Sequence, residues 1–289
     1  MRFQWPEGAK CAVALSFEYD AESVEYGFKK HYSGSSDWGG FAPRFGIPRM
    51  LELLDNYGIK GTFFVPGWDA ERYPESVRDI ARAGHEVAAH GYIHEDFSRL
   101  SEKEEREVFD KAHNILTEIT GTPPRGFRSG AYWKPLSPNT LRFLRDMGYC
   151  YDSSYLDDDE PYAIKIEGEE PGVIEIPWAW VLNDLIYISV PFSSGIGLVL
   201  PTRTSQWILE IWKEEFDSLY EKVGFFNLVV HPTHMGAGCR MPLMEGMIRF
   251  IRGYADIWVA TYGEIADLCL KQIREGLVHG SSSSADRIF

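Results

Sequence analysis

Two histidines four residues apart, His90 and His94, follow a short apolar run of the chain. Imidazole is the commonest ligand of divalent metals in proteins, and a pair of imidazoles is often completed by a carboxylate. Asp20 can supply that carboxylate, because it follows another short apolar run. Two histidines and one aspartate at strand ends predict an open metal site suited to hydrolysis. The alternative is that the histidines are unrelated, with one capping a turn and the other exposed.

Glu18 precedes Asp20 by two positions, so both carboxylates project to the same side of an extended chain. Two carboxylates this close are not expected to have the same role. One can bind a cation while the other accepts a proton from the attacking water. A solvated acidic loop is the alternative, and it suits Glu22 and Glu25 better because they do not end an apolar run.

His231 and Arg128 also follow apolar runs of the sequence. A histidine directly after the run 225–230 is well placed as a general acid that protonates a leaving group. It could instead be a cap or a core histidine, and His234 competes for the same role. An arginine at a strand end can pair with a carboxylate and hold its orientation, unless it lies at the surface. Asp184 could orient the imidazole of His231.

Three aromatic residues are candidates for substrate contact: Trp180, Tyr132 and Tyr92. Trp180 and its neighbour Trp178 follow a strand-like run, where they can wall a pocket or pack in the core.

Composition excludes several classes of function. The chain has 289 residues, enough for one large α/β domain or two small ones, and no convincing linker divides it. Its formal net charge is −14 without a basic cluster, which argues against nucleic acid or an anionic membrane surface as a partner. Neither a signal-peptide pattern nor a bilayer-spanning apolar run is present, so we expect a cytoplasmic protein. The 4 scattered cysteines are expected to be buried free thiols.

Short apolar runs alternate with amphipathic segments along most of the chain. Predicted strands cover residues 11–17, 61–65, 86–89, 126–128, 149–152, 173–180, 225–230 and 257–260. Predicted helices cover residues 101–120, 137–148, 204–222, 241–253 and 263–275. This alternation predicts an α/β fold, a complete or distorted (β/α) barrel, with a doubly wound open sheet as the alternative.

Two long connections interrupt the alternation. Residues 21–46 are rich in Gly, Ser and aromatic residues and suggest a lid or a contact surface, including one between subunits. Residues 157–171 are acidic and predict a second excursion over the site. We therefore expect a single domain over residues 1–275 and a disordered tail over 276–289.

These motifs, in this order, resemble the NodB-like polysaccharide deacetylase family, carbohydrate esterase family 4, over roughly residues 12–268. The resemblance implies a distorted (β/α) barrel and a divalent metal, usually zinc. It assigns the metal to Asp20, His90 and His94, the catalytic base to Glu18, its partner to Arg128 and the general acid to His231. The subgroup it resembles contains the Helicobacter-type peptidoglycan deacetylase, metal-independent allantoinases and cyclic imide hydrolases. Retention of both histidines argues for metal dependence, and the relatives suggest a homo-oligomer.

One motif departs from the family pattern. The usual Thr-Phe-Asp-Asp-Gly is here Ser-Phe-Glu-Tyr-Asp, residues 16–20, so the expected base is longer by one methylene. We expect a zinc-dependent hydrolase of C–N amide bonds that removes N-acetyl groups from amino-sugar or peptidoglycan-type substrates. The alternatives are a hydrolase of small cyclic amides, such as imides or hydantoin-like rings, and a non-catalytic metal- or sugar-binding protein.

Overall fold

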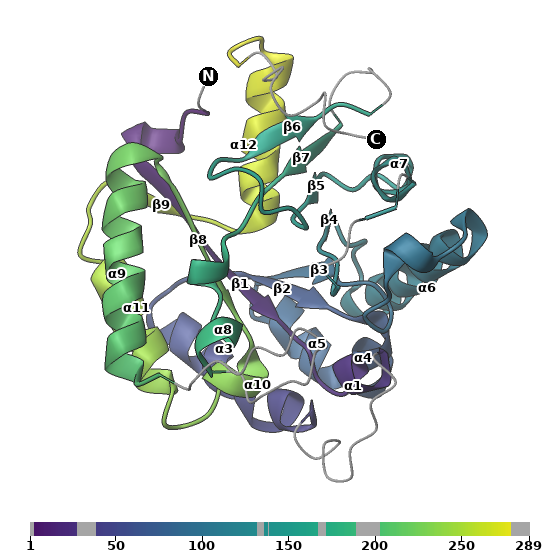
Figure 1. The fold of residues 1–289 in the computed structure, drawn as a ribbon, viewed down its shortest axis with the longest axis horizontal. Helices are drawn as coiled ribbons and strands as arrows, with labels where there is room; N and C mark the ends of the chain where they lie inside the picture. Colours follow the sequence, from purple (N-terminus) through teal and green to yellow (C-terminus); the bar gives the residue numbers. More distant parts are fainter. Residues whose placement is uncertain are drawn as a thin grey trace.

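A curled sheet of mostly parallel strands lies at the centre of the fold (Figure 1). The structure, a computed structural model, describes residues 3–27, 39–131, 136–137, 139–166, 172–188 and 203–278. The strand order is β6-β7-β5-β4-β3-β2-β1-β8, and β9 pairs with β1. The strands are β1 Cys11–Glu18, β2 Thr62–Val65, β3 Glu86–Ala89, β4 Gly126–Phe127, β5 Tyr151–Asp152, β6 Tyr162–Ile164, β7 Val173–Glu175, β8 Phe225–Val230 and β9 Ile257–Val259.

Strand β1 is the longest of the described strands and is buried along its whole length. One of its edges pairs with β8, while the other pairs first with β9 and then with β2. Its two faces differ in side-chain size. Val13, Leu15 and Phe17 face the larger apolar cluster, whereas Ala12 and Ala14 belong to a second cluster on the opposite side. The small residues leave room there for larger side chains from other strands.

The barrel is incomplete. Within the described ranges no ladder joins β8 to β6, the two ends of the strand order. Two single contacts join β8 to the segment that follows β7. Asn227 Nδ2 donates to the carbonyl of Pro177, and Asn183 forms an isolated bridge with Val229. The prediction of a distorted (β/α) barrel in one domain is therefore confirmed.

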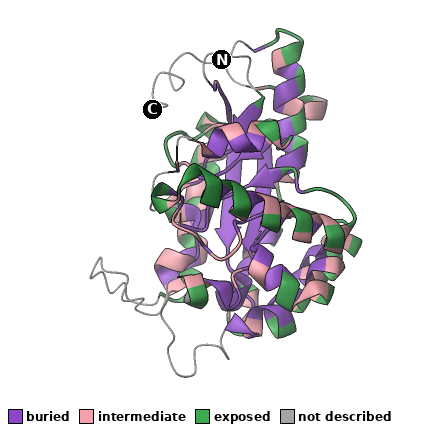
Figure 2. Cartoon of the chain, turned by 90° about the vertical axis from the view of Figure 1, so that its right-hand side faces the viewer, coloured by how far each residue is buried: buried purple, intermediate pink, exposed green. Residues whose placement is uncertain are grey.

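Helices surround this sheet, and their outward faces are exposed while most strands are buried (Figure 2). Capping boxes start α6 at Ser101 and α12 at Thr261. The α-helices are α1 Ser23–Gly27, α3 Ile47–Asn56, α4 Gly67–Arg72, α5 Pro74–Arg82, α6 Glu102–Thr120, α7 Thr140–Asp146, α8 Leu185–Ile188, α9 Ser205–Lys222, α10 Pro232–Met235, α11 Met241–Ile251 and α12 Tyr262–Arg274. The short 3-10 and π elements are η1 Pro6–Gly8, η2 Ala42–Gly46, η3 Phe97–Arg99 and η4 Trp180–Leu182.

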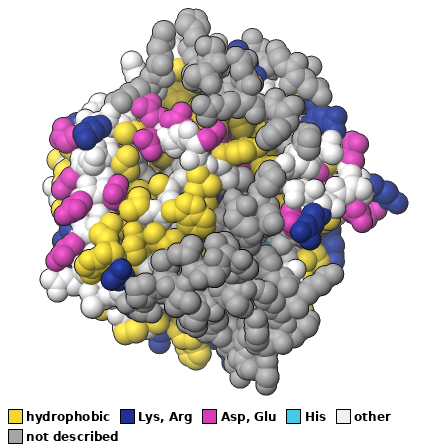
Figure 3. Space-filling view, viewed as in Figure 1, with side chains coloured by type: hydrophobic (Ala, Val, Ile, Leu, Met, Phe, Trp, Pro, Cys, Tyr) yellow, Lys and Arg dark blue, Asp and Glu magenta, His cyan; other side chains and the backbone are white. Residues whose placement is uncertain are grey.

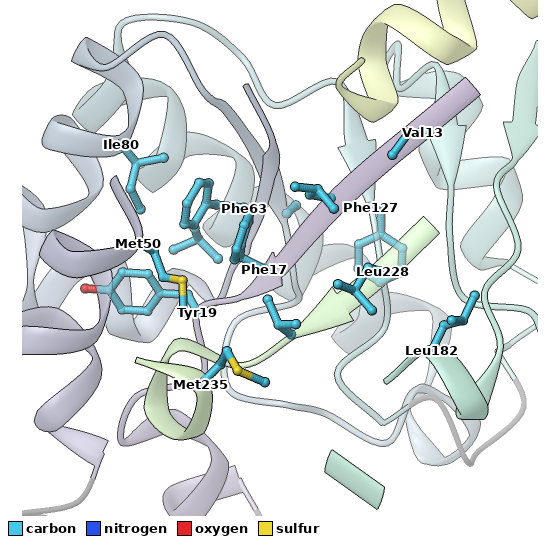
Figure 4. Packing of buried hydrophobic residues seen from close by; sticks show 14 of the residues in the cluster. Val13, Phe17, Tyr19, Met50, Phe63, Ile80, Phe127, Leu182, Leu228 and Met235 are labelled. Carbon is cyan, nitrogen blue, oxygen red and sulfur yellow. The ribbon is translucent and has the colours of Figure 1, made fainter. Parts of the chain in front are cut away.

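The core lies between the sheet and these helices. Figure 4 shows Phe17 of β1 beside Phe63 of β2, and their rings stack with centroids 4.5 Å apart. Met50 of α3 and Ile80 of α5 extend the same buried cluster. Such packing holds the strand ends in fixed positions, which a site built from several strands requires.

The surface agrees with the acidic composition. Acidic side chains gather along the edge of the molecule that α9 forms (Figure 3). Among the described residues, no helix is both long enough and apolar enough to cross a membrane. The expected cytoplasmic location and homo-oligomer stay predictions.

The predicted strands agree with the structure at their starts better than at their ends. The run 173–180 is a strand only to Glu175, and Trp180 lies in the 3-10 turn η4. Strand β6 was not predicted from the sequence. It lies inside the acidic segment 157–171 and pairs antiparallel with β7. A strand of three residues is too short to produce a periodic pattern.

The segment 21–46 is less irregular than predicted, because α1 and η2 lie within it. Its residues 28–38 fall outside the described residues, so its role as a lid or subunit contact stays a prediction. The same holds for the predicted tail beyond residue 278. All 4 cysteines are free as expected. Cys11 and Cys269 are also buried as expected, but Cys150 is only half-buried and Cys239 is exposed.

Candidate active site

Most of the predicted chemical groups lie at the carboxyl ends of adjacent parallel strands. Glu18 ends β1, and His231 follows β8 directly. His90 follows β3, and Arg128 follows β4. Because parallel strands end at the same edge of a sheet, side chains that are far apart in sequence converge there. Helices α1 and α10 lie at this end of β1 (Figure 1).

The three predicted metal ligands meet at this edge. Asp20 Oδ1 lies 2.9 Å from His94 Nε2 and 3.5 Å from His90 Nε2. One ligand atom from each residue lies within 4.8 Å of the other two. Burial raises the pKa of Asp20, but the charge of His94 outweighs it and holds that pKa well below its usual range. Asp20 is therefore ionised, as a ligand must be.

The loop from His90 to His94, called the histidine loop below, has a backbone shape that brings both histidines to Asp20. Gly91 has φ +70°, and His94 itself has φ +60°, a left-handed conformation that is rare outside glycine. Asp20 has φ +30°, and its carbonyl accepts a hydrogen bond of 2.7 Å from the Thr233 hydroxyl. Gly130 allows a close approach, because a Cβ there would lie 2.4 Å from His94 Cδ2. Left-handed residues of this kind cluster at functional sites, where surrounding contacts hold them.

The tautomer of His90 tests whether the site suits a cation. Its Nδ1 lies 2.7 Å from the carbonyl oxygen of Arg128, which can only accept, so Nδ1 carries the proton. Burial lowers the pKa of His90 to about 4, so the ring is neutral near pH 7 and Nε2 presents a lone pair. Among the residues that the structure describes, that buried Nε2 has no hydrogen-bond partner, and it faces Asp20. A lone pair beside a carboxylate fits a bound cation, and the residues present therefore suit a divalent metal.

Glu18 bridges two other members of the site. Its Oε1 lies 3.1 Å from Arg128 Nη1, and its Oε2 lies 2.9 Å from His231 Nε2. Burial raises the pKa of Glu18, but the charge of His231 outweighs it and, with the charges of His90 and Arg128, lowers that pKa overall. The extra methylene of Glu18 thus carries one carboxylate oxygen to each partner.

His231 is held between two carboxylates. Its Nδ1 lies 2.6 Å from Asp184 Oδ1, and its backbone N–H donates to Asp184 Oδ2 at 3.0 Å. Burial lowers the pKa of His231, yet the charges of Asp184 and Glu18 raise it well above its usual range. Both ring nitrogens are therefore protonated in the free protein. The competing candidate His234 is different, because burial lowers its pKa to about 4.

Arg128 is fully buried, so it is not a surface arginine. Besides Glu18, its guanidinium donates to Ser153 and Tyr262, and it lies 4.1 Å from the ring centroid of Phe64. Sequence reasoning did not find Ser153 or Tyr262. Their contribution depends on the pairing of β5 with β4 and on where α12 begins beside the sheet, which no local pattern reveals.

Two of the three predicted substrate aromatics, Trp180 and Tyr92, lie among the described residues. Trp180 is 39% exposed and packs against the buried Trp178, with ring centroids 5.0 Å apart. The Tyr92 hydroxyl donates to Glu71 at 2.7 Å, and Lys111 lies 3.5 Å from the centroid of its ring. Tyr132 lies outside the described residues. Substrate contact by these three residues stays a prediction.

A further carboxylate, Asp69, lies close to the site and was missed by sequence reasoning. It is fully buried in the first turn of α4 and interacts with Ser23, which contacts His94. Burial raises the pKa of Asp69 to about 6, against the opposing effect of hydrogen bonds from Ser23. The available signal was the same as for Asp20, an acidic residue soon after a short apolar run.

Comparison with known proteins finds relatives over most of the chain. The family model described as polysaccharide deacetylase matches residues 38–151. The chain is 31% identical to the peptidoglycan deacetylase of Helicobacter pylori, over 90% of this chain and 97% of that protein. It is 30% identical to a peptidoglycan deacetylase-like protein of Gibberella zeae, over 88% of this chain and 85% of the other.

Solved structures share the fold over nearly the full length. A Mycobacterium smegmatis structure assigned to the polysaccharide deacetylases superposes with a TM-score of 0.86 at 33% identity, covering 98% of this chain and 96% of its own. An allantoinase structure superposes with a TM-score of 0.77 at 24% identity, covering 92% of both chains. The second likeness supports the fold only.

Proposed function

Because this chain belongs to the polysaccharide deacetylase family, we propose that it is a metal-dependent hydrolase that removes N-acetyl groups from amino-sugar substrates of the peptidoglycan type. One observation carries the proposal. The neutral His90 presents a buried Nε2 lone pair to the ionised Asp20, and His94 completes a set of three metal ligands. This is the donor set expected of an open catalytic zinc site.

Asp20, His90 and His94 would hold the divalent cation, which we assign to zinc. When bound, the cation would act as a Lewis acid that polarises the amide carbonyl and acidifies water. Glu18 is ionised and can accept a proton from the attacking water at Oε2. Arg128 holds the other oxygen of that carboxylate, which keeps Oε2 directed into the site.

His231 supplies the second proton transfer. Its Nε2–H can protonate the departing nitrogen, and Asp184 stabilises the charged ring before that step. The C–N bond then breaks to give a free amine and acetate. Glu18 has gained one proton and His231 has lost one, so a single transfer restores the starting state. The 2.9 Å separation of Glu18 Oε2 and His231 Nε2 allows that transfer directly.

A second candidate is hydrolysis of a small cyclic amide, which uses the same proton transfers. The burial of the site favours it: Glu18 and His90 side chains are 0% exposed and the Asp20 side chain is 12% exposed. Such a site suits a compact substrate better than a long glycan chain.

The proposals separate in one experiment. Zinc-loaded protein is incubated with N-acetylglucosamine oligomers and, in parallel, with small cyclic imides, and the products are quantified. Chelator-treated protein and Glu18→Gln serve as controls. Zinc-dependent acetate release supports the deacetylase, and imide opening alone supports the second candidate. Metal binding without turnover of either substrate would leave a non-catalytic binding protein. Turnover that survives metal removal would contradict the proposed mechanism.

A further inference from the structure

The first turn of α4 contacts both segments that carry the candidate metal ligands. Its backbone N–H groups reach the loop between the two histidines. Gly67 N donates to the carbonyl of Gly91 at 3.0 Å, and Trp68 N donates to the carbonyl of Tyr92 at 2.9 Å. These bonds fix the course of the chain from His90 to His94.

The side chain of Asp69, in the same turn, reaches the segment after Asp20. Its carboxylate accepts three hydrogen bonds, from the Ala21 N–H at 3.1 Å, the Ser23 N–H at 3.0 Å and the Ser23 hydroxyl at 2.5 Å. The Ala21 N–H belongs to the peptide that follows Asp20, whose φ is +30°. Asp69 thus holds the backbone of that ligand in an uncommon conformation.

Ser23 links Asp69 to His94. Its Oγ lies 3.2 Å from His94 Nδ1. Because the Ser23 hydroxyl proton is donated to Asp69, Oγ is left to accept a proton from His94 Nδ1. The proton on Nδ1 leaves Nε2 as the nitrogen that can bind a cation, and Nε2 is the atom that lies 2.9 Å from Asp20 Oδ1.

We propose that Asp69 is a positioning residue that holds two of the three metal ligands in binding geometry, Asp20 through its backbone and His94 through Ser23. The inference rests on the proposed metal-dependent function. Outer-shell groups that accept the second N–H of a ligating histidine fix its tautomer and ring orientation. One buried carboxylate that serves two ligands couples the β1 end to the histidine loop.

The test measures metal binding rather than turnover. Wild type, Ser23→Ala, Ser23→Thr and Asp69→Asn are titrated with Co²⁺ against a chromophoric chelator, and the visible spectrum of bound Co²⁺ is recorded. We expect Ser23→Ala to bind about 10- to 100-fold more weakly, with an altered spectrum. Asp69→Asn should bind Co²⁺ more weakly still, because its amide nitrogen faces a backbone donor in either orientation, the Ser23 N–H at the position of Oδ1 or the Ala21 N–H at the position of Oδ2. Ser23→Thr should restore both affinity and spectrum, since it keeps the hydroxyl.

A second buried carboxylate provides matched controls. Glu105 of α6 accepts hydrogen bonds from the hydroxyls of Ser137 and Thr140 and has no part in the site. Ser137→Ala and Glu105→Gln remove the same kind of contact elsewhere, and thermal melts of all metal-free variants report any general loss of stability. The controls should bind Co²⁺ within twofold of wild type.

The contrary outcomes are distinct. If Ser23→Ala and Asp69→Asn keep wild-type affinity and spectrum, the positioning role is overturned while the proposed function stands. Equal losses in the Ser137 and Glu105 controls would also overturn it, because the effect would be general. Failure of the wild type to bind Co²⁺ or Zn²⁺ would overturn both this inference and the metal-dependent function.

Discussion

His231 Nε2 and Glu18 Oε2 lie 2.9 Å apart, so the two groups proposed to exchange protons with the substrate are in direct contact. Each is anchored on its other side, His231 by Asp184 and Glu18 by Arg128. The charges of the pair stabilise each other, which keeps the carboxylate ionised and the imidazole protonated. A base without its proton and an acid with its proton are what amide hydrolysis requires at the start of each turnover.

Replacing the base tests this arrangement directly. Glu18→Gln keeps the size of the side chain but cannot accept the proton from water, so we expect kcat to fall about 100- to 10,000-fold. Zinc affinity should stay within a few-fold of wild type, because Glu18 is not one of the three ligands. Steady-state kinetics and metal titration measure the two effects separately. Unchanged turnover would exclude Glu18 as the base.

Asp184 should control the pH dependence of activity. Its charge is the main influence that raises the pKa of His231 against the effect of burial. In Asp184→Asn that pKa falls, so the imidazole loses its proton at a lower pH. The alkaline limb of the kcat/KM profile should therefore shift to lower pH, while activity at the acidic end changes less. A uniform loss at every pH would point to misplacement of the ring instead.

Zinc should stabilise the protein through His90. A ligand that binds only the folded state at about 100 times its Kd adds roughly 2.7 kcal/mol of stability. We expect zinc to raise the melting temperature of wild type and to have little effect on His90→Ala. His113→Ala is the matched control, because His113 lies on α6 and contacts Tyr149 rather than the site. Melting curves with zinc and with chelator measure the difference.

The pair of carboxyl groups at Asp152 and Glu175 should make stability depend on pH. They face each other across β5 and β7 and are both fully buried. Burial raises the pKa of Asp152 to about 6 and, with the Asp152 charge, raises that of Glu175 well above its usual range. Because both folded-state pKa values exceed those of the unfolded chain, the protonated pair contributes fully at low pH. That contribution is lost as the pH rises through about 6 and beyond.

Glu175→Gln imitates the protonated acid and tests whether stability falls as the pH rises. Its carbonyl can still accept the hydrogen bond from the Tyr155 N–H, and its amide can donate to Asp152. The melting temperature of the variant minus that of wild type should therefore be larger at pH 8 than at pH 5. A difference of about 1 kcal/mol corresponds to roughly 2–4 °C in a domain of this size. An equal difference at both pH values would contradict the raised pKa values of Asp152 and Glu175.

Residues at strand ends were the most predictable part of the site. Each apolar run marks a buried strand, and a polar residue directly after it must lie at the edge where parallel strands end. That reasoning placed Glu18, Arg128 and His231 correctly at one edge. The same reasoning applies to Asp69. It was not predicted because no second candidate ligand lies near it in the sequence, as His94 lies near His90.

The amino-acid sequence by itself determined the strand–helix alternation, the polar groups at the strand ends and, through its motifs, the resemblance to a family. Those features are local, since burial and backbone preference act over a few neighbouring residues. Only the tertiary structure decided that Glu18 reaches both Arg128 and His231, and that Asp69 holds the segment after Asp20. Such contacts join residues far apart in sequence, and they depend on strand order, register and the packing of α4, which no short stretch of sequence encodes.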